Sequence, residues 1–149
     1  MSRRGSVIGR PMEILLVEDD LEDAGLTIDV LRQGDVPCRI SLVRDGSEAL
    51  EFIRRQGHFA RAPRPDVILL DLHLPKMEGR EVLAEIRGDK QLRRIPVVVL
   101  TSSRSHWEVL KSENLFVESF LVKPIEPGQF TAVVKSLRKF LLADVILPP

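Results

Sequence analysis

Several features that mark other classes of protein are scarce or missing in this sequence. Cys38 is the one cysteine in 149 residues, so no internal disulfide can form and the chain suits a reducing compartment. Lysine plus arginine and aspartate plus glutamate number 22 each, a balance that favours neither nucleic acid nor an anionic membrane as partner. Residues 1–11 lack the apolar run of roughly 7 to 15 residues that a secretory signal needs. We therefore expect a cytoplasmic protein with a flexible N-terminal arm over residues 1–11.

Three patterns that mark common active sites are missing as well. A nucleotide-binding fold would need a glycine-rich turn after the first apolar run, but EDDLED stands there, at residues 18–23, and would repel a pyrophosphate. Neither a Ser-His-Asp order nor a cysteine-rich metal spacing occurs. The histidines, His58, His73 and His106, are scattered, and we expect each of them on the surface and not as a side-chain metal ligand.

Apolar runs that favour β-structure recur along the chain and predict five strands. The third and fourth runs are apolar at every position, which is typical of parallel strands covered on both faces. The runs lie at residues 14–17, 40–43, 67–70, 97–100 and 120–122.

Apolar residues at helical spacing fill the intervals between these strands. One predicted helix has Leu21, Ala24, Ile28 and Leu31 on a single face and stops at Gly34. Further helices are predicted over residues 47–55, 79–88, 105–114 and 127–141. Strand and helix thus alternate five times, which predicts an α/β fold in one domain, residues 12–141: a doubly wound parallel sheet of five strands with helices on both faces. Ligands of such folds bind at the carboxyl ends of the strands.

Polar side chains follow four of the predicted strands, at the point where each strand ends. Glu18 and Asp19 follow the first strand, Asp71 the third, Thr101 the fourth and Lys123 the fifth. Carboxylates that converge within a few ångströms repel one another unless they take up protons or bind a cation, and hard oxygen ligands suit Mg²⁺. Asp71 could then act as a nucleophile toward phosphorus, while the Thr101 hydroxyl and the Lys123 ammonium contact phosphoryl oxygens. The set predicts a phosphoryl-transfer site.

Four segments together resemble the receiver domains of two-component response regulators. They are LLVEDD at 15–20, DLHLPKMEG at 71–79, VVVLTSS at 97–103 and FLVKP at 120–124, and the resemblance extends from Glu13 to about Leu141. Each segment alone is a weak signal, but the combination is specific. The resemblance implies the flavodoxin-like receiver fold and a signalling switch that catalyses only its own phosphoryl transfer and dephosphorylation.

The resemblance also implies a role for each matching residue. Asp71 would accept a phosphoryl group from a phosphohistidine of a sensor histidine kinase. Glu18, Asp19 and Asp71 would hold Mg²⁺ together with the backbone carbonyl of His73, and Lys123 would contact the phosphoryl group. Thr101 and Phe120 would form the switch pair, and Pro124 would follow Lys123 in an often cis peptide. Asp20 is left as a helix-start residue.

The sequence departs from many receivers at Phe116 and Val117, where a Gly-Ala pair is common. With the longer loop at 57–65 and the ending FLLADVILPP, this resembles the small regulators paired with cyanobacterial and bacterial phytochromes, which would make the kinase a phytochrome.

Few residues follow the last predicted helix, so no DNA-binding domain is expected and the output is a protein contact. We expect an exposed apolar strip at Leu142, Val145, Ile146 and Leu147 in the tail, residues 142–149, and a homodimer formed through the last helix and this tail. A tail folded back on its own domain is the alternative.

Two other functions stay open at this point. A phosphohydrolase of the haloacid-dehalogenase type also combines a nucleophilic aspartate, a hydroxyl, a lysine and Mg²⁺. Such enzymes carry the nucleophile on the first strand with a second aspartate two residues on, whereas here Asp71 follows the third strand and position 73 is histidine. The third reading is a receiver-shaped interaction module that is never phosphorylated.

Overall fold

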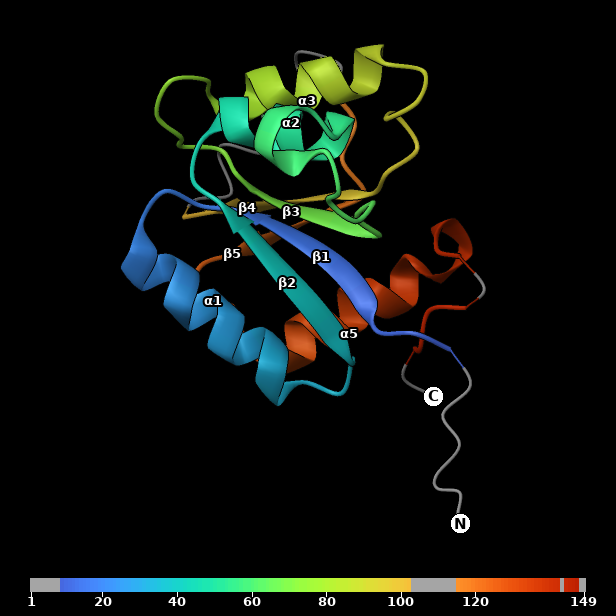
Figure 1. Ribbon diagram of the computed structural model, residues 1–149. Coiled ribbons are helices and arrows are strands. Elements are labelled where there is room, and N and C mark those ends of the chain that lie inside the picture. The colour runs from blue at the N-terminus through green and yellow to red at the C-terminus, as the bar shows by residue number, and fades with distance from the viewer. Residues whose placement is uncertain (1–8, 103–114, 143, 148–149) are drawn as a thin grey trace.

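The computed structural model describes residues 9–102, 115–142 and 144–147. Five parallel strands form one sheet in the order β2-β1-β3-β4-β5 (Figure 1). The predicted doubly wound fold is therefore confirmed, and each strand contains the apolar run that predicted it. The strands are β1 (Met12–Val17), β2 (Cys38–Val43), β3 (Val67–Asp71), β4 (Val97–Thr101) and β5 (Ser119–Val122).

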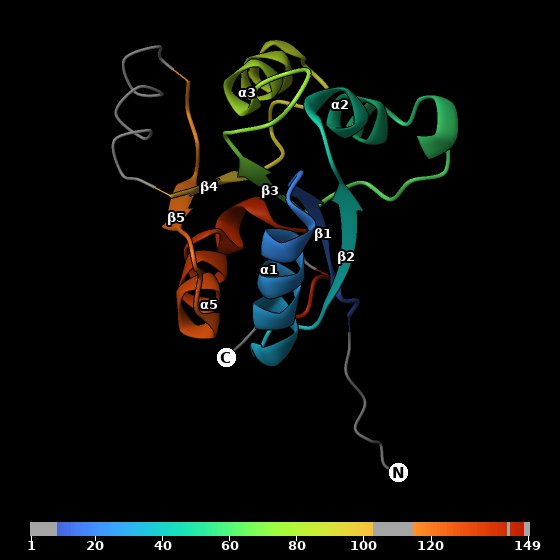
Figure 2. The same cartoon turned by 90° about the vertical axis from the view of Figure 1, so that its left-hand side faces the viewer.

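Helices cover both faces of the sheet. Figures 1 and 2 show α1 (Leu21–Gln33) and α5 (Pro127–Ser136) on one face and α2 (Gly46–Arg54) and α3 (Gly79–Gly88) on the other. Two short 3₁₀ helices, η1 (Gly57–Phe59) and η2 (Arg138–Phe140), follow α2 and α5. The helix predicted over residues 105–114 lies outside the described residues.

The core has two layers, which explains the continuous apolar runs in β3 and β4. Ile68 and Leu70 pack with α2 and α3, whereas the intervening Leu69 packs with α1 and α5. Every residue of β3 and β4 is buried. Because successive side chains of a strand point to opposite faces, a strand covered on both sides must be apolar throughout. Each fully buried leucine or valine contributes about 1.5–3 kcal/mol through removal of apolar surface from water.

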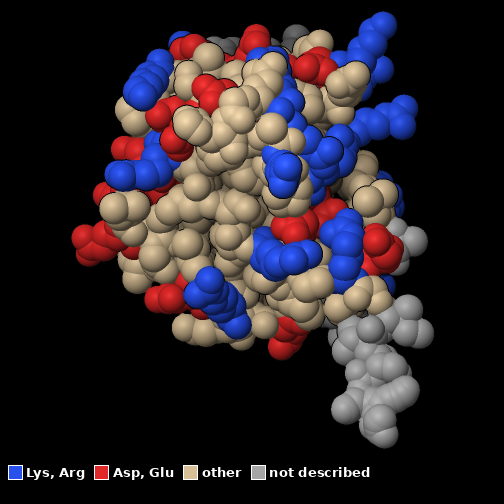
Figure 3. Space-filling model, in the orientation of Figure 1, with Lys and Arg blue, Asp and Glu red and all other residues tan. Residues whose placement is uncertain are grey.

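β2 is an edge strand and is less buried than the central strands. Cys38, Ile40 and Leu42 are half-buried, and burial raises the pKa of the Cys38 thiol. Figure 3 shows a largely uncharged area in the middle of this face, where β2 runs, with cationic and anionic side chains interspersed around it.

Two helix predictions need correction. Leu21, predicted on the buried face of α1, is 58% exposed because it is the first residue of the helix, beyond the end of β1. Thr27 is buried in α1 together with Ala24 and Leu31. The last helix was predicted to reach Leu141, but α5 ends at Ser136 and η2 follows it.

The segment before β5 contains the two residues that depart from the usual receiver pattern. Phe116 is 61% exposed, and the Arg87 guanidinium lies over its ring at 5.6 Å from the centroid. Arg87 also donates a hydrogen bond of 2.8 Å to Glu118, whereas Val117 is buried. A large side chain at 116 is therefore accommodated by packing on the C-terminal end of α3.

The described part of the tail folds back on its own domain. The Arg10 amide donates to the Asp144 carbonyl (2.7 Å) and the Ile146 amide donates to the Arg10 carbonyl (2.9 Å), which makes a parallel bridge between Arg10 and Val145. Val145 is consequently only 6% exposed, so the prediction of an exposed strip is wrong for this residue, whereas Leu142 is 60% exposed. Ile146 and Leu147 are half-buried.

The Arg10 side chain strengthens this attachment. Its guanidinium makes two hydrogen bonds to the buried Asp66 carboxylate, at 2.7 and 2.8 Å, and a third to Asp144 at 3.2 Å. Arg10 was predicted to lie in the flexible arm, but these contacts hold it against the domain. Within the part of the chain that the structure describes, no helix is both long and apolar enough to cross a bilayer.

Candidate active site

The register of the parallel strands brings the predicted site residues to one edge of the sheet. Val17 of β1 pairs with Leu70 of β3, so Glu18 and Asp71, the residues that follow, lie side by side. Asp71 pairs with Leu100 of β4, and Thr101 pairs with Val122 of β5, directly before Lys123. The chain moves from β1 outward to β2 and then back to β3, so the crevice between β1 and β3 is the switch point at which such folds bind ligands.

Lys123 is the centre of the contacts at this edge. Its ammonium nitrogen lies 2.6 Å from Glu18 Oε1, 2.8 Å from Asp71 Oδ2 and 3.3 Å from Asp23 Oδ2. Glu18 and Asp71 are only 1% and 4% exposed, and among the residues that the structure describes Lys123 is the cation that contacts both of them. One ammonium facing three carboxylates leaves the cluster with excess negative charge, which favours a bound cation.

Three of the acids are placed to share a metal ion. Ligand oxygens of Glu18, Asp19 and Asp71 all lie within 4.8 Å of one another. Three carboxylates with an open side toward solvent match the preference of Mg²⁺ for a few protein oxygens and several waters. The residues present therefore fit a divalent cation bound at hard oxygen ligands.

Burial and the neighbouring charges shift the protonation of the two groups in closest contact. Burial, followed by the hydrogen bond with Asp71, raises the pKa of Glu18 to about 7. Burial alone would lower the pKa of Lys123, but its hydrogen bonds to Asp71 and Glu18 raise that pKa above the ordinary lysine value. Lys123 is therefore a stable cation at this site.

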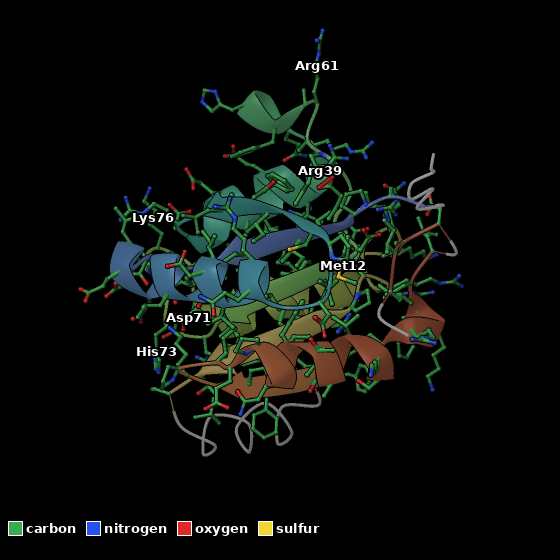
Figure 4. The ribbon with its side chains drawn as sticks, turned by 90° about the horizontal axis from the view of Figure 1, so that it is seen from below. Met12, Arg39, Arg61, Asp71, His73 and Lys76 are labelled. Atoms are coloured by element: carbon green, nitrogen blue, oxygen red, sulfur yellow. The ribbon has the colours of Figure 1, made fainter. Side chains whose placement is uncertain are left out.

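The loop after β3 is held tightly around Asp71. The His73 amide donates to Asp71 Oδ1 at 2.9 Å, and the Gly79 amide donates to the Leu72 carbonyl at 3.1 Å. A Cβ at Gly79 would collide with the backbone of Asp71 and Leu72, so this position requires glycine. Figure 4 shows Asp71, His73 and Lys76 together at one end of the sheet, away from Met12, where β1 begins.

A cavity of about 560 Å³ opens onto the acidic cluster. Besides the charged residues it has an apolar wall, which α1 and the segment after Lys123 provide through Leu26, Val30 and Ile125. Leu26 is 57% exposed. The site thus combines a cluster of charged residues with an apolar wall that is partly exposed to solvent.

The structure brings most of the predicted site residues together. Glu18, Asp19, Asp71 and Lys123 meet at one point, and Thr101 lies at the end of β4, where its side chain is 1% exposed. Phe120 is half-buried on β5 and packs on the α2 and α3 side of the core. The peptide between Lys123 and Pro124 is cis, as the resemblance implied.

Other predictions concern residues at the margin of the site. Asp20 accepts a hydrogen bond from the Asp23 amide at 3.0 Å and so begins α1, as expected. His58 and His73 are exposed, and His106 lies outside the described residues. Sequence reasoning missed Asp23. Asp23 lies one helical turn after Asp20, but this spacing alone does not show that Lys123, at the end of β5, reaches it.

Comparison with known proteins gives consistent similarities. Residues 14–135 match the family described as the response regulator receiver domain. The chain is 43% identical over 138 residues to the response regulator Rcp1 of Synechocystis sp., covering 93% of this chain and 94% of Rcp1. A solved structure of Rcp1 in its Mn²⁺-bound form has a TM-score of 0.70 at 42% identity, covering 93% of this chain and 100% of that one.

Two further solved structures are similar over almost the whole chain. The bacteriophytochrome response regulator RtBRR has a TM-score of 0.81 at 44% identity, covering 94% of this chain and 86% of that one. The phosphorylated cyanobacterial phytochrome response regulator RcpA has a TM-score of 0.72 at 43% identity, covering 94% of this chain and 100% of that one.

Proposed function

This chain belongs to the response regulator receiver family, and we propose that its Asp71 accepts a phosphoryl group from the phosphohistidine of a sensor histidine kinase. An Asp71 carboxylate oxygen attacks phosphorus as the bond between phosphorus and the histidine nitrogen breaks, and the imidazole leaves. The observation that carries this proposal is the contact of Lys123 with both Glu18 and Asp71 in one crevice. This contact places a cation beside the nucleophile, where negative charge develops as the phosphoryl group is transferred.

The remaining residues take supporting roles in this proposal. Glu18, Asp19 and Asp71 would hold Mg²⁺, with the backbone carbonyl of His73 as a further ligand, and the ion would offset the charge of the incoming phosphoryl oxygens. Mg²⁺ is supported by the close approach of the three carboxylates and by the Mn²⁺-bound form of Rcp1. The Thr101 hydroxyl would donate a hydrogen bond to one phosphoryl oxygen, and the Lys123 ammonium would contact another.

Phosphorylation acts here as a switch between two states. The phosphoryl group adds charge and acceptor oxygens, favours the state in which the Thr101 hydroxyl turns toward it, and lets the Phe120 ring pack inward. Thr101 and Phe120 are close in the sheet because Val99 pairs with Phe120 and Thr101 follows two residues later. The surface that includes β5 and its preceding segment changes as a result. The protein catalyses no reaction beyond its own phosphorylation and dephosphorylation.

The proposed partners follow from the relatives and from the exposed apolar residues. RtBRR and RcpA are response regulators of phytochromes, which supports a phytochrome as the kinase of this protein. A homodimer through α5 and the tail is supported by Leu142 and Phe140, which are 60% and 47% exposed after α5. A cytoplasmic location fits a kinase partner and the single cysteine.

The haloacid-dehalogenase alternative is set aside, because its nucleophile would stand at the end of β1 and Asp71 ends β3.

The alternative of an interaction module that is never phosphorylated is tested by replacing the nucleophile. Asp71→Asn should take up no phosphoryl group from acetyl phosphate or from the kinase, measured as the mass of the intact protein. Asp19→Asn, which keeps the nucleophile, should label slowly. Labelling of Asp71→Asn at position 71 or elsewhere at the wild-type rate would contradict the proposal.

A further inference from the structure

Asp23 is a charged residue of the site that the proposed reaction does not use. Its Oδ2 lies 3.3 Å from the Lys123 ammonium, and its side chain is 44% exposed at the mouth of the cavity. It is not among the three acids whose ligand oxygens converge within 4.8 Å. Asp23 therefore contacts the lysine without belonging to the proposed metal site.

The position of Asp23 is fixed by the start of α1. Its backbone amide donates to Asp20 Oδ1 at 3.0 Å, and the Asp20 amide donates to Glu18 Oε2 at 3.2 Å. A short chain of hydrogen bonds thus connects the acidic turn to the first turn of the helix. Because the backbone at residue 23 is held in this way, its carboxylate stays within reach of Lys123.

The contact matters because Lys123 has three N–H donors and three carboxylate neighbours. A cation between Glu18, Asp19 and Asp71 would compete for two of these neighbours, and a phosphoryl group on Asp71 would compete for the lysine itself. Asp23 would then be the carboxylate that still attracts Lys123 toward α1. Each hydrogen bond given to Asp23 is one that the lysine cannot give to the phosphoryl group.

We propose that Asp23 is a positioning residue that holds Lys123 on the α1 side of the site and so weakens the interaction of the Lys123 ammonium with the phosphoryl group. This inference rests on the proposed function, since it assumes that Lys123 contacts a phosphoryl oxygen. Its consequence is a phosphorylated state that is less stable than the site could otherwise provide.

The test compares Asp23→Asn with Glu22→Gln in the full chain. Both variants remove one negative charge from the first turn of α1, but Glu22 is exposed and is not one of the three carboxylates that contact Lys123. The probe is beryllofluoride at saturating Mg²⁺, with its dissociation constant measured by calorimetry. Asp23→Asn should bind about two- to fivefold more tightly than wild type, the effect of one partly exposed ion pair, and Glu22→Gln should match wild type. Asp23→Glu, which restores the charge, should return toward the wild-type value.

A second readout follows the lysine directly. The NMR signal of the Lys123 ammonium in the protein without beryllofluoride should shift in Asp23→Asn and stay in place in Glu22→Gln. Two results would overturn the inference and leave the proposed function standing. In the first, beryllofluoride binds both variants more tightly by the same factor. In the second, wild type binds beryllofluoride and Asp23→Asn has the same dissociation constant. Wild type that binds no beryllofluoride in Mg²⁺ would overturn both.

Discussion

The ammonium nitrogen of Lys123 lies 2.8 Å from Oδ2 of Asp71, although 52 positions separate the two residues in the chain. The contact exists because β3 and β5 both pair with β4, which brings their carboxyl ends to the same edge. It compensates the charge of a buried carboxylate in the absence of a metal. Any metal ion that binds Glu18 and Asp71 must therefore compete with the Lys123 ammonium.

This competition predicts the behaviour of Lys123→Ala. Loss of the ammonium leaves Glu18 and Asp71 without their cation, so the variant should bind Mg²⁺ about threefold or more tightly than wild type, as measured by calorimetry. Beryllofluoride should no longer stabilise the variant, because the ammonium that is proposed to contact the anion is missing. Lys76→Ala is the control, since Lys76 is exposed and pairs with Asp45 instead, at 3.4 Å. Wild-type Mg²⁺ affinity in Lys123→Ala would show that the lysine and the metal do not compete.

Leu26 provides a test of how the kinase meets the site. It is exposed on the apolar wall of the cavity beside Asp71, where a protein donor would touch it and acetyl phosphate would not. Leu26→Ser should lower kcat/KM for transfer from the kinase about fivefold or more, as for a central apolar contact of an interface. The rate with acetyl phosphate should stay within about twofold, because Asp71 is unaltered. Arg39→Ala is the control, because the exposed Arg39 side chain lies near the start of β2, away from Asp71; it should leave both rates unchanged. An equal loss in the two variants would argue against a docking role for Leu26.

Arg10 should contribute to stability through Asp66. Arg10→Ala leaves the buried Asp66 carboxylate without its two guanidinium hydrogen bonds, so the free energy of unfolding in urea should fall by about 1–3 kcal/mol. Hydrogen exchange at the Ile146 amide should accelerate, because that amide donates to the Arg10 carbonyl. The control is Arg39→Ala, because the Arg39 side chain is 68% exposed. This variant should change the free energy of unfolding by less than about 0.5 kcal/mol. Unaltered exchange at Ile146 would mean that the Arg10 side chain does not hold the tail.

Gly79 should tolerate no side chain. Gly79→Ala places a Cβ against the backbone of Asp71 and Leu72, so the free energy of unfolding should fall by about 1–3 kcal/mol and the loop that follows Asp71 should shift. Gly25→Ala is the matched control, because nothing lies within 4 Å of its added Cβ. The free energy of unfolding of Gly25→Ala should rise by up to about 1 kcal/mol, since alanine is favoured over glycine inside a helix. Thermal unfolding of both variants makes the comparison, and equal effects would contradict the steric account.

The sequence was sufficient to predict the sheet, because a parallel strand covered on both faces must be apolar at each position, as β3 and β4 are. It also predicted which residues end the strands. It could not predict the register, which decides that Lys123 reaches both Glu18 and Asp71. Leu21 was misplaced because helical spacing indicates a face but not where the sheet beneath that face stops.

The tail was mispredicted for a related reason. Val145 has no local signal that distinguishes a residue exposed for a partner from one covered by its own chain. Its burial depends on main-chain pairing with Arg10, 135 residues earlier by their numbers, which only the folded sheet brings near. Asp23 was overlooked because EDDLED reads equally well as a solvated helix start, and its contact with Lys123 requires the position of β5.

The bridge between Arg10 and Val145 lies near the amino ends of the strands, whereas Asp71 lies at the carboxyl ends. The two places are separated by the length of β1. A partner that bound the tail would therefore leave Asp71 accessible, so the proposed dimer contact and the proposed phosphoryl transfer can occur on one copy of the protein at the same time.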